Sequence, residues 1–400
     1  MKLNLSRKLK NVSSSMTLKI TAKANEMRDN GVDIIGFGAG EPDFNTPENI
    51  QYGAIDAIIS GKTKYTPASG IKELKDAICE KFKKDNNLAY LQDNIIVSNG
   101  AKHSLYNALC AILNPGDEVI ISSPYWVSYP ELIKLAGGKP VLIETKEENH
   151  FKYTVMDLEK AFTENTKAII LNTPNNPTGS VYNETELKDI ADWAVENKVL
   201  VISDEIYEKL IYDDNKHISI ASLGKEIKEL TIVINGMSKA FSMTGWRIGF
   251  AAANDEIIRL MSNFQSHTTS NPSSISQYAS IKGLTESYDI INNMRNHFIN
   301  RRDYMVEKIN SIPGMSCYNP GGAFYIMANI SKLKNKSING RLVDSSMTFS
   351  NILLEEAHVA VIPGIAFGND DYIRISYATS MDNIEKGLDR IERFIRGGII

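Results

Sequence analysis

Residues 235–249 read Asn-Gly-Met-Ser-Lys-Ala-Phe-Ser-Met-Thr-Gly-Trp-Arg-Ile-Gly and follow an apolar run at residues 231–234. That run is typical of a buried parallel strand, which would place Ser238 and Lys239 at its carboxyl end. A lysine there can form a Schiff base with a carbonyl when burial or nearby cations lower its pKa. Arg247, eight residues on, offers a bidentate fork for phosphate. Together these residues suggest pyridoxal phosphate (PLP) held as an imine, although a Ser-Lys pair alone is usually a solvated loop.

The bulk properties of the chain narrow the class of protein. Its 400 residues exceed what one core usually supports, so we expect a large domain and a smaller one. A net charge of -4 gives no electrostatic reason to expect nucleic acid or an anionic membrane as a partner. Three scattered cysteines, Cys79, Cys110 and Cys317, predict neither a disulfide framework nor a metal site and fit a reducing cytoplasm. No stretch approaches the roughly 20 apolar residues of a membrane span, and the first residues lack a signal-peptide core.

Short apolar runs alternate with helical patterns through the middle of the chain. The runs lie at residues 94–98, 118–122, 167–171, 199–202 and 231–234. This alternation predicts an α/β fold with a mostly parallel sheet covered by helices. The carboxyl ends of parallel strands meet at one edge of a sheet, so the polar residues that follow the runs should converge there. These residues are Asn176, Asp204, Tyr207, Ser238 and Lys239.

Two glycine-containing segments point to close contact with a ligand. The strand at residues 94–98 is broken at Gly100, and a helix is expected to open at Ala101, which aims free N–H groups and the positive end of the helix dipole at an anion. A plain strand-to-helix turn is the alternative there. The Gly-x-Gly-x-Gly pattern at residues 36–40 resembles a dinucleotide motif, but Pro42 follows and no helix opens. We therefore expect the backbone near Gly40 to approach a small ligand.

The chain divides into three segments by pattern. Residues 46–290 are expected to form the large, cofactor-binding domain. Residues 1–45 would form an N-terminal arm and part of a small α+β domain, which residues 291–400 complete.

Several motifs together resemble those of class I (fold type I) PLP-dependent aminotransferases. The stretch at residues 235–249 resembles the PLP-lysine signature of that family. The other motifs, in the family's order, are Gly-Glu-Pro-Asp-Phe at 40–44, Pro-Tyr-Trp-Val-Ser-Tyr-Pro at 124–130, Asn-Asn-Pro-Thr-Gly at 175–179, Ser-Asp-Glu-Ile-Tyr at 203–207 and Arg-Ile-Ser-Tyr-Ala at 374–378. The resemblance covers nearly the full length and is close to the bacterial aspartate aminotransferases of the lysine-containing subgroup.

The resemblance implies three catalytic residues. Lys239 would form the internal imine with PLP and then shuttle the proton between the substrate's Cα and the cofactor. Asp204 would keep the ring nitrogen protonated, and Asn176 and Tyr207 would hydrogen-bond the ring oxygen. Read without the family, Asp204 would more simply cap a helix, Asn176 would belong to a turn and Tyr207 would be a packing residue.

The resemblance also implies how the cofactor is held. Arg247, Ser238 and the helix start at Gly100 and Ala101 would bind the phosphate. Tyr65 would reach the phosphate of the partner subunit in a homodimer. The flat ring of Trp126 would stack on the pyridine. Gly236 stands where many relatives carry a further serine.

Substrate recognition is implied by a smaller set of residues. Arg374 would bind the α-carboxylate, with a backbone N–H from Gly40. Lys102 matches the position from which the subgroup supplies a lysine for the distal carboxylate, with Ser15 or Thr17 assisting. Lys102 could equally be a solvent-exposed lysine in the first turn, where the helix dipole disfavours it.

The resemblance therefore implies ping-pong transfer of the amino group of L-aspartate to 2-oxoglutarate, giving oxaloacetate and L-glutamate. An aminotransferase for aromatic amino acids or prephenate is the nearest alternative. A PLP-binding transcriptional regulator would need an N-terminal DNA-binding domain, for which the motifs leave no room. A β- or γ-eliminating lyase is the third alternative.

Overall fold

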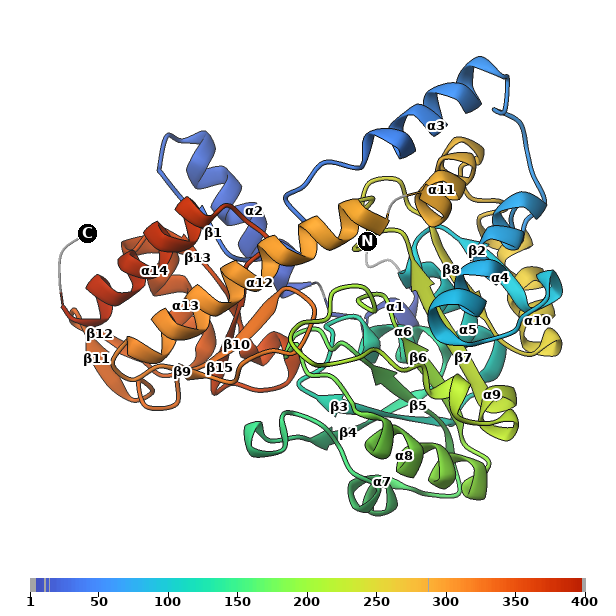
Figure 1. The fold of residues 1–400 in the computed structure, drawn as a ribbon. Helices are drawn as coiled ribbons and strands as arrows, with labels where there is room; N and C mark the ends of the chain where they lie inside the picture. Colours follow the sequence, from blue (N-terminus) through green and yellow to red (C-terminus); the bar gives the residue numbers. More distant parts are fainter. Residues whose placement is uncertain (1–4, 11, 14, 287, 398–400) are drawn as a thin grey trace.

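The computed structural model describes residues 5–10, 12–13, 15–286 and 288–397. Within these residues, seven strands form one large sheet in the order β2-β8-β7-β6-β5-β3-β4 (Figure 1). The strands are β2 (Ile95–Ser98), β3 (Glu118–Ser123), β4 (Lys139–Glu144), β5 (Thr166–Asn172), β6 (Leu200–Asp204), β7 (Thr231–Gly236) and β8 (Gly249–Ala252). All adjacent pairs are parallel except those of β8, which is antiparallel to both β2 and β7. The predicted α/β fold with a mostly parallel sheet is confirmed, and β4 and β8 were not predicted.

Several helices cover both faces of this sheet, and others belong to a second body. The helices of the first 200 residues are α1 (Arg7–Lys10), α2 (Met16–Asp29), α3 (Glu48–Ile59), α4 (Lys72–Asn86), α5 (Ala101–Ile112), α6 (Tyr129–Ala136), α7 (Val155–Ala161) and α8 (Glu184–Asn197). Later helices are α9 (Lys225–Leu230), α10 (Asp255–Thr268), α11 (Ser274–Glu286), α12 (Tyr288–Ser311), α13 (Ser346–Glu356) and α14 (Met381–Ile395). None of the helices in the described part of the chain combines the length and apolar character that a membrane crossing needs.

The alternation of side chains along the strands explains why both faces are covered. Ile232 and Ile234 of β7 pack on one face with residues of α5, α6 and α10. Val233, between them, points to the other face and packs with α4 and α11. On that second face Val201 of β6 packs with α8. Because successive residues of a strand point to opposite faces, a strand buried on both sides has to be apolar throughout, as these runs are.

A second body contains a four-stranded antiparallel sheet in the order β14-β15-β10-β9. Its strands are β9 (Ser316–Cys317), β10 (Tyr325–Asn329), β14 (Ile362–Pro363) and β15 (Tyr372–Ser376). Two short pairs accompany it, β1 (Ile35–Gly36) with β13 (Val359–Ala360), and β11 (Lys336–Ile338) with β12 (Arg341–Val343). The parallel pairing of β1 with β13 joins the N-terminal part of the chain to its C-terminal part. Figure 1 shows α12 extending from the side of the large sheet into this body.

Helices close the core of the second body. Phe298 of α12, Phe349 of α13 and Leu388 of α14 pack with Phe324, the residue before β10. Ile384, Leu388, Ile391 and Ile395 recur at helical spacing, which predicts an apolar stripe on the last helix; the first three are buried and Ile395 is partly buried. Ile35 and Phe37, from the N-terminal part of the chain, belong to the same core. The division at residues 46 and 291 stays a prediction.

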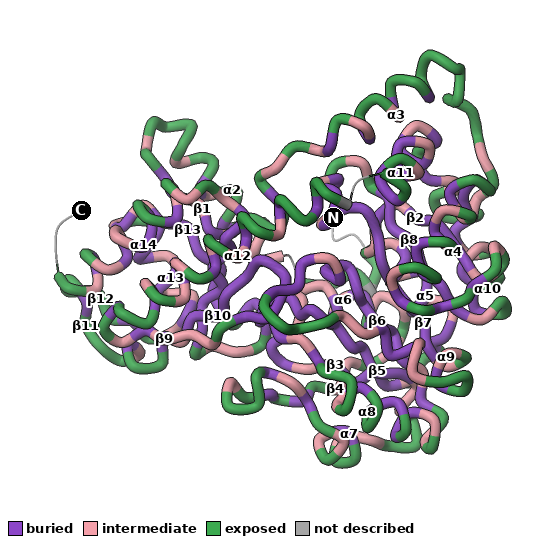
Figure 2. The backbone as a smooth tube through the Cα atoms, viewed as in Figure 1, coloured by how far each residue is buried: buried purple, intermediate pink, exposed green. Residues whose placement is uncertain are grey.

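Burial differs sharply between the sheet and one outlying helix. The strands of the large sheet are buried nearly throughout except for the edge strand β4, whereas α3 is largely exposed (Figure 2). The sequence Asn183-x-x-Glu186 is a capping-box pattern, which predicts the start of a helix there. Asn183 and Glu186 form this box at the start of α8, each side chain accepting the other's backbone N–H at 3.0 and 2.8 Å.

Candidate active site

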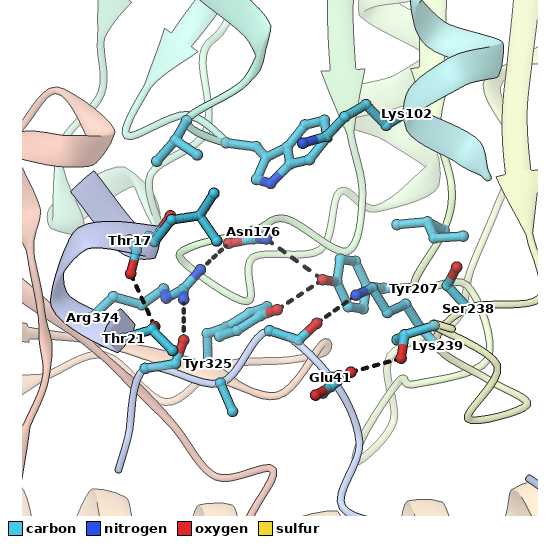
Figure 3. A pocket seen from close by; sticks show the side chains of 18 of the residues that line it. Thr17, Thr21, Glu41, Lys102, Asn176, Tyr207, Ser238, Lys239, Tyr325 and Arg374 are labelled. Atoms are coloured by element: carbon cyan, nitrogen blue, oxygen red, sulfur yellow. Dashed lines mark hydrogen bonds between the residues drawn. The ribbon is translucent and has the colours of Figure 1, made fainter. Parts of the chain in front are cut away.

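A cavity of about 570 Å³ lies at the carboxyl edge of the parallel strands, between the large sheet and the second body. Asn172, Asp204 and Lys239 reach it from the ends of β5, β6 and β7. The second body contributes Tyr325 and Arg374. Figure 3 shows Lys239, Tyr325 and Arg374 converging from elements far apart in the chain. All five residues predicted to converge at the strand ends line this one cavity, and they are Asn176, Asp204, Tyr207, Ser238 and Lys239.

Lys239 follows β7 by three residues and projects into the cavity. Its Nζ donates a hydrogen bond to the carbonyl oxygen of Gly40 (Figure 3). Burial lowers the pKa of Lys239 to about 8, with Arg374 and Arg247 adding to the effect and Glu41 opposing it. An amine with this pKa is available both as a base and as an acid near neutral pH.

Asp204 ends β6 and is 6% exposed. Its Oδ2 accepts a hydrogen bond from the hydroxyl of Tyr129 at 2.8 Å, and its Oδ1 accepts one from the N–H of Ile206 at 3.3 Å. Burial raises the pKa of Asp204 to about 6 even though both hydrogen bonds lower it. Residues 206–209 form turns, so Asp204 does not cap a helix. The site therefore holds a buried carboxylate that would gain from a cationic partner.

Asn176 and Tyr207 form a hydrogen-bonded group with Tyr325. Asn176 is fixed by its N–H, which donates to Oδ1 of Asn172 at 2.8 Å. Its side-chain Nδ2 donates to the Tyr207 hydroxyl at 3.5 Å, and that hydroxyl lies 3.0 Å from the hydroxyl of Tyr325 (Figure 3). Burial raises the pKa of both tyrosines, so both are neutral phenols at physiological pH.

Arg374 lies on β15 and is 4% exposed. Its guanidinium donates to Oδ1 of Asn176 and to the carbonyl of Gly38, each at 3.1 Å. It is stacked between two rings, 4.3 Å from the centroid of Tyr325 and 4.9 Å from that of Phe367. Its Nε is buried and finds no hydrogen-bond partner among the described residues. A planar cation held this rigidly, with donor capacity to spare, fits a carboxylate.

The strand-to-helix junction at Gly100 forms a cradle beside Arg247. Gly100 has a φ of 88° and is followed by α5, whose first residues Ala101 and Lys102 line the cavity. The first N–H groups of a helix have no partner within it and favour an anion. A Cβ on Gly100 would collide with the guanidinium of Arg247, so only glycine lets the two approach. Arg247 donates to the carbonyls of Thr244 at 2.8 Å and of Asn99 at 3.2 Å.

The family model for class I and II aminotransferases matches residues 32–391 of the chain. The chain belongs to this family. It is 52% identical to the aspartate aminotransferase of Bacillus sp. (strain YM-2) over 99% of this chain and 100% of that protein. It is 46% identical to a probable aspartate/prephenate aminotransferase of Aquifex aeolicus over 98% of this chain and 99% of that protein. The crystal structure of the aspartate aminotransferase from Rhizobium meliloti superimposes with a TM-score of 0.96, at 41% identity over 99% of both chains.

Class I aminotransferases are PLP enzymes, and the cavity of this family member fits that cofactor. PLP carries an aldehyde, a ring nitrogen that can be protonated and a phosphate. The cavity offers an amine with a lowered pKa in Lys239 and a buried carboxylate without a cation in Asp204. It also offers the cradle of Gly100 and Arg247, which a Cβ would fill. Each chemical feature of the cofactor thus finds a complementary group.

The remaining predicted residues of this aminotransferase lie as follows. Gly40, Ala101, Lys102 and Trp126 line the cavity. The Nζ of Lys102 lies 4.8 Å from the centroid of the Trp126 ring, and burial lowers the pKa of Lys102. Tyr65 is 92% exposed and is not among the described residues that line the cavity of its own chain.

The two helpers proposed for Lys102 are also present near the cavity. Thr17 lines it, and its hydroxyl lies 2.6 Å from that of Ser15. Ser15 itself caps α2 by accepting the N–H of Leu18.

Sequence reasoning missed several residues that line the cavity of this aminotransferase. Tyr129 lies inside the motif at residues 124–130, and its contact with Asp204 joins the start of α6 to the end of β6, which no local pattern encodes. Tyr325 begins β10, and strand alternation does not say which residue of β10 faces the cavity. Glu41 accepts a hydrogen bond from Thr244 at 2.6 Å. The two residues are far apart in the chain, so no local sequence pattern predicts this contact.

A second cluster of ionisable residues lies outside the cavity of this family member. Glu205, Glu208 and His217 have the spacing of metal ligands. Lys81 already forms a buried salt bridge with Glu208, and His217 Nε2 lies 2.9 Å from Glu205. A divalent cation would have to compete with the lysine, so we interpret this cluster as a structural polar network.

Proposed function

We propose that this chain transfers the amino group of L-aspartate to 2-oxoglutarate, giving oxaloacetate and L-glutamate. The observation that carries the proposal is the placement of Lys239, Asp204 and Arg374 around one cavity: a titratable amine, a buried carboxylate and a stacked guanidinium. The two half-reactions would use the same site in turn, which is a ping-pong mechanism. The relatives named aspartate aminotransferase support aspartate as the amino donor.

Each residue that would hold PLP has a distinct task. When bound, PLP withdraws electrons from the substrate's Cα, which acidifies the proton there. Asp204 would keep the ring nitrogen protonated, and Tyr207 and Asn176 would donate hydrogen bonds to the ring oxygen. Trp126 would cover one face of the ring.

The phosphate would be held by a separate group of residues. Arg247, the hydroxyl of Ser238 and the N–H groups at Gly100 and Ala101 would provide it with charge and donors. The dipole of α5 adds to the positive potential there. Lys102 stands in the first turn of the same helix, where its charge would favour the same anion.

Lys239 would carry the proton in the reaction. Because its pKa is lowered to about 8, a substantial share of the amine is unprotonated near neutral pH and can take the proton from Cα. The resulting ammonium can then return the proton at another atom. The carbonyl of Gly40, which accepts a hydrogen bond from Nζ, would steady the lysine between these two states.

Arg374 and Lys102 would read the two carboxylates of the substrate. Arg374 has a free Nε and lies next to the strand-end residues, which suits the α-carboxylate. The N–H of Gly40 would add a donor. Lys102 stands over Trp126 at the other end of the cavity and would bind the distal carboxylate, as in the lysine-containing subgroup.

A wider donor range is the second candidate function. The cavity extends past Arg374 to Thr17, Thr21 and Arg28 of α2, which leaves room for a donor larger than aspartate. The name of the Aquifex aeolicus relative includes prephenate. A panel of kcat/KM values decides between the two, because aromatic donors or prephenate outrunning aspartate would overturn the aspartate assignment.

We also propose that the chain acts as a homodimer in which Tyr65 reaches the partner's phosphate site. The outer face of α3 exposes Tyr52, Ile55, Ile58 and Ile59, and Tyr65 follows on the same segment. A run of exposed apolar side chains of this size is typical of an interface. Sedimentation equilibrium checks this: a mass of one chain at micromolar concentration would contradict it.

The proposed chemistry is tested by the absorption spectrum of the protein with PLP and by the Lys239→Ala variant. The wild type should take up PLP covalently, so that borohydride reduction fixes the cofactor to the chain. Lys239→Ala should bind PLP without reducible attachment and lose at least about 10²–10⁴-fold in kcat/KM. Lys332→Ala, at an exposed lysine, is the control. Reducible attachment retained in Lys239→Ala would show that another residue holds the cofactor.

A further inference from the structure

Tyr325 contacts two residues of the proposed machinery at once. Its hydroxyl lies 3.0 Å from that of Tyr207, and its ring stacks under the guanidinium of Arg374 at 4.3 Å. Both contacts are buried, since Tyr325 is fully covered. Figure 3 shows Tyr325 between the other two side chains.

The strand pairing explains why these contacts are fixed. Tyr325 on β10 is paired with Ser376 on β15, and Met327 is paired with Arg374. Tyr325 and Arg374 are therefore diagonal neighbours on one face of an antiparallel pair, a spacing that aromatic and long side chains can bridge. The phenol is thus carried to Tyr207 by a strand of the second body.

The hydrogen-bonding capacity of Tyr207 determines what Tyr325 can do. A phenol has one proton to donate and two positions that accept. Asn176 donates to Tyr207 through Nδ2, and this orientation is set because its Oδ1 accepts from Arg374. If Tyr325 donates as well, both accepting positions of Tyr207 are filled, and its own proton is left for the cavity. Burial keeps both phenols protonated, so each has one proton to place.

We infer that Tyr325 is a positioning residue for the proposed transamination. Its hydroxyl donates to Tyr207 and thereby directs the proton of Tyr207 toward the ring oxygen of the cofactor, while its ring holds Arg374 in place for the substrate carboxylate. The inference rests on the proposed function, because it assigns Tyr207 as the donor to that oxygen. Tyr325 would thus affect both the charge on the ring oxygen of the cofactor and the binding of the substrate carboxylate by Arg374.

The test separates the hydroxyl from the ring. Tyr325→Phe removes only the hydroxyl, and the readout is the pH midpoint of the visible absorption change of the PLP-loaded protein. A weaker donor to the ring oxygen leaves more negative charge there, which favours the protonated form of the chromophore. The midpoint should therefore rise, by roughly 0.3–1 pH unit for one neutral hydrogen bond. A fall in the midpoint would mean that Tyr207 donates to Tyr325 in the PLP-loaded protein. An unchanged midpoint would mean that the contact has no effect on the chromophore. Either result overturns the inference.

The role of the ring is read from KM and kcat. Tyr325→Phe keeps the ring over Arg374, so KM for aspartate should stay within about twofold of the wild type. Tyr325→Leu removes the ring and should raise KM by roughly 2- to 30-fold, the range of a buried cation–π contact. Equal KM values for the two variants would contradict the role of the ring.

A matched control and a double variant guard against a general structural effect. Tyr212→Phe removes a buried hydroxyl that donates to the carbonyl of Ala323, which also accepts from Tyr377. It should leave the pH midpoint unchanged. In a Tyr207→Phe background, adding Tyr325→Phe should shift the midpoint no further, because Tyr325 acts through Tyr207. A further shift of the same size would refute that route.

Failure of the inference is distinguishable from failure of the proposed function. If the wild-type protein takes up no PLP, the proposed function itself is wrong. If the wild type loads PLP and Tyr325→Phe behaves like Tyr212→Phe, only the inference about Tyr325 is wrong.

Discussion

Asp204→Asn should stabilise the cofactor-free protein while weakening its hold on PLP. Asp204 is buried at the end of β6 and its pKa is raised from 3.8 to about 6. Its neutral form is therefore favoured by folding, and this contribution is complete below the ordinary pKa and is lost as the pH rises through 6. Above that pH the folded protein contains an ionised carboxylate whose burial costs more than the attraction of Lys239 repays, and asparagine relieves this cost.

The size of the effect follows from the shift. Two units of pKa at 1.36 kcal/mol each give about 3 kcal/mol at pH 8, and roughly half of that at pH 5, where folding already favours the protonated acid. An unfolding entropy of about 2.1 cal/mol/K per residue over the 400 residues converts 3 kcal/mol into a rise in Tm of about 3–4 °C. With PLP the sign reverses, because removing the charge opposite a cationic ring should weaken binding by about 30-fold to several thousandfold.

The change in stability is measured by thermal unfolding of the PLP-free wild type and variant at pH 8 and at pH 5. The change in PLP affinity is measured by PLP titrations at pH 8. Tyr129→Phe is the matched change on the donor side, since it removes the 2.8 Å hydrogen bond to Asp204 and should lower Tm at pH 8. An Asp204→Asn variant with an unchanged Tm at pH 8, or with a gain independent of pH, would refute the idea that Asp204 is a costly buried charge.

Two further predictions concern the ends of the cavity. Lys102→Met should raise the activation free energy for dicarboxylate donors by about 2–3 kcal/mol and leave that for alanine nearly unaffected. The measurement is kcat/KM for aspartate and for alanine. Equal losses for both donors would contradict the role of Lys102 at the distal carboxylate. Tyr65→Phe should reduce PLP affinity by about three- to tenfold if its hydroxyl reaches the partner's phosphate, and an unchanged Kd for PLP in equilibrium titration would exclude that contact.

The sequence predicts those parts of the fold that depend on local patterns. Apolar runs predict the parallel strands, and a capping pattern predicts the start of α8, because both signals depend only on residues that are close together in the sequence. The antiparallel β8 was missed because its four residues, Gly249–Ala252, are too short and too small to show a strand pattern. Its place between β2 and β7 depends on pairing between distant segments.

The same division holds at the candidate site. Lys239 and Asp204 follow strands of the large sheet, so their placement at one cavity followed from the order of the strands. Arg374 lies on β15 of the other body, and only the resemblance of its motif to the family predicted its role. Tyr129 and Tyr325 act by contact with other side chains, and no spacing in the sequence encodes a hydroxyl 3.0 Å from Tyr207. Residues that act by holding another side chain in place are therefore found from the structure and not from the sequence.

The antiparallel course of β8 has a mechanical consequence. Because β8 runs back along β7, its first residue and not its last stands at the cavity edge, paired with Gly236. The connection between the two strands is only twelve residues long and carries both Lys239 and Arg247. The amine and the proposed phosphate anchor therefore share one short loop that is tethered at both ends by strands, whereas Arg374 belongs to the other body. A hinge motion of that body would move Arg374 toward or away from the amino acid, while the residues on the loop that would hold the cofactor stay in place.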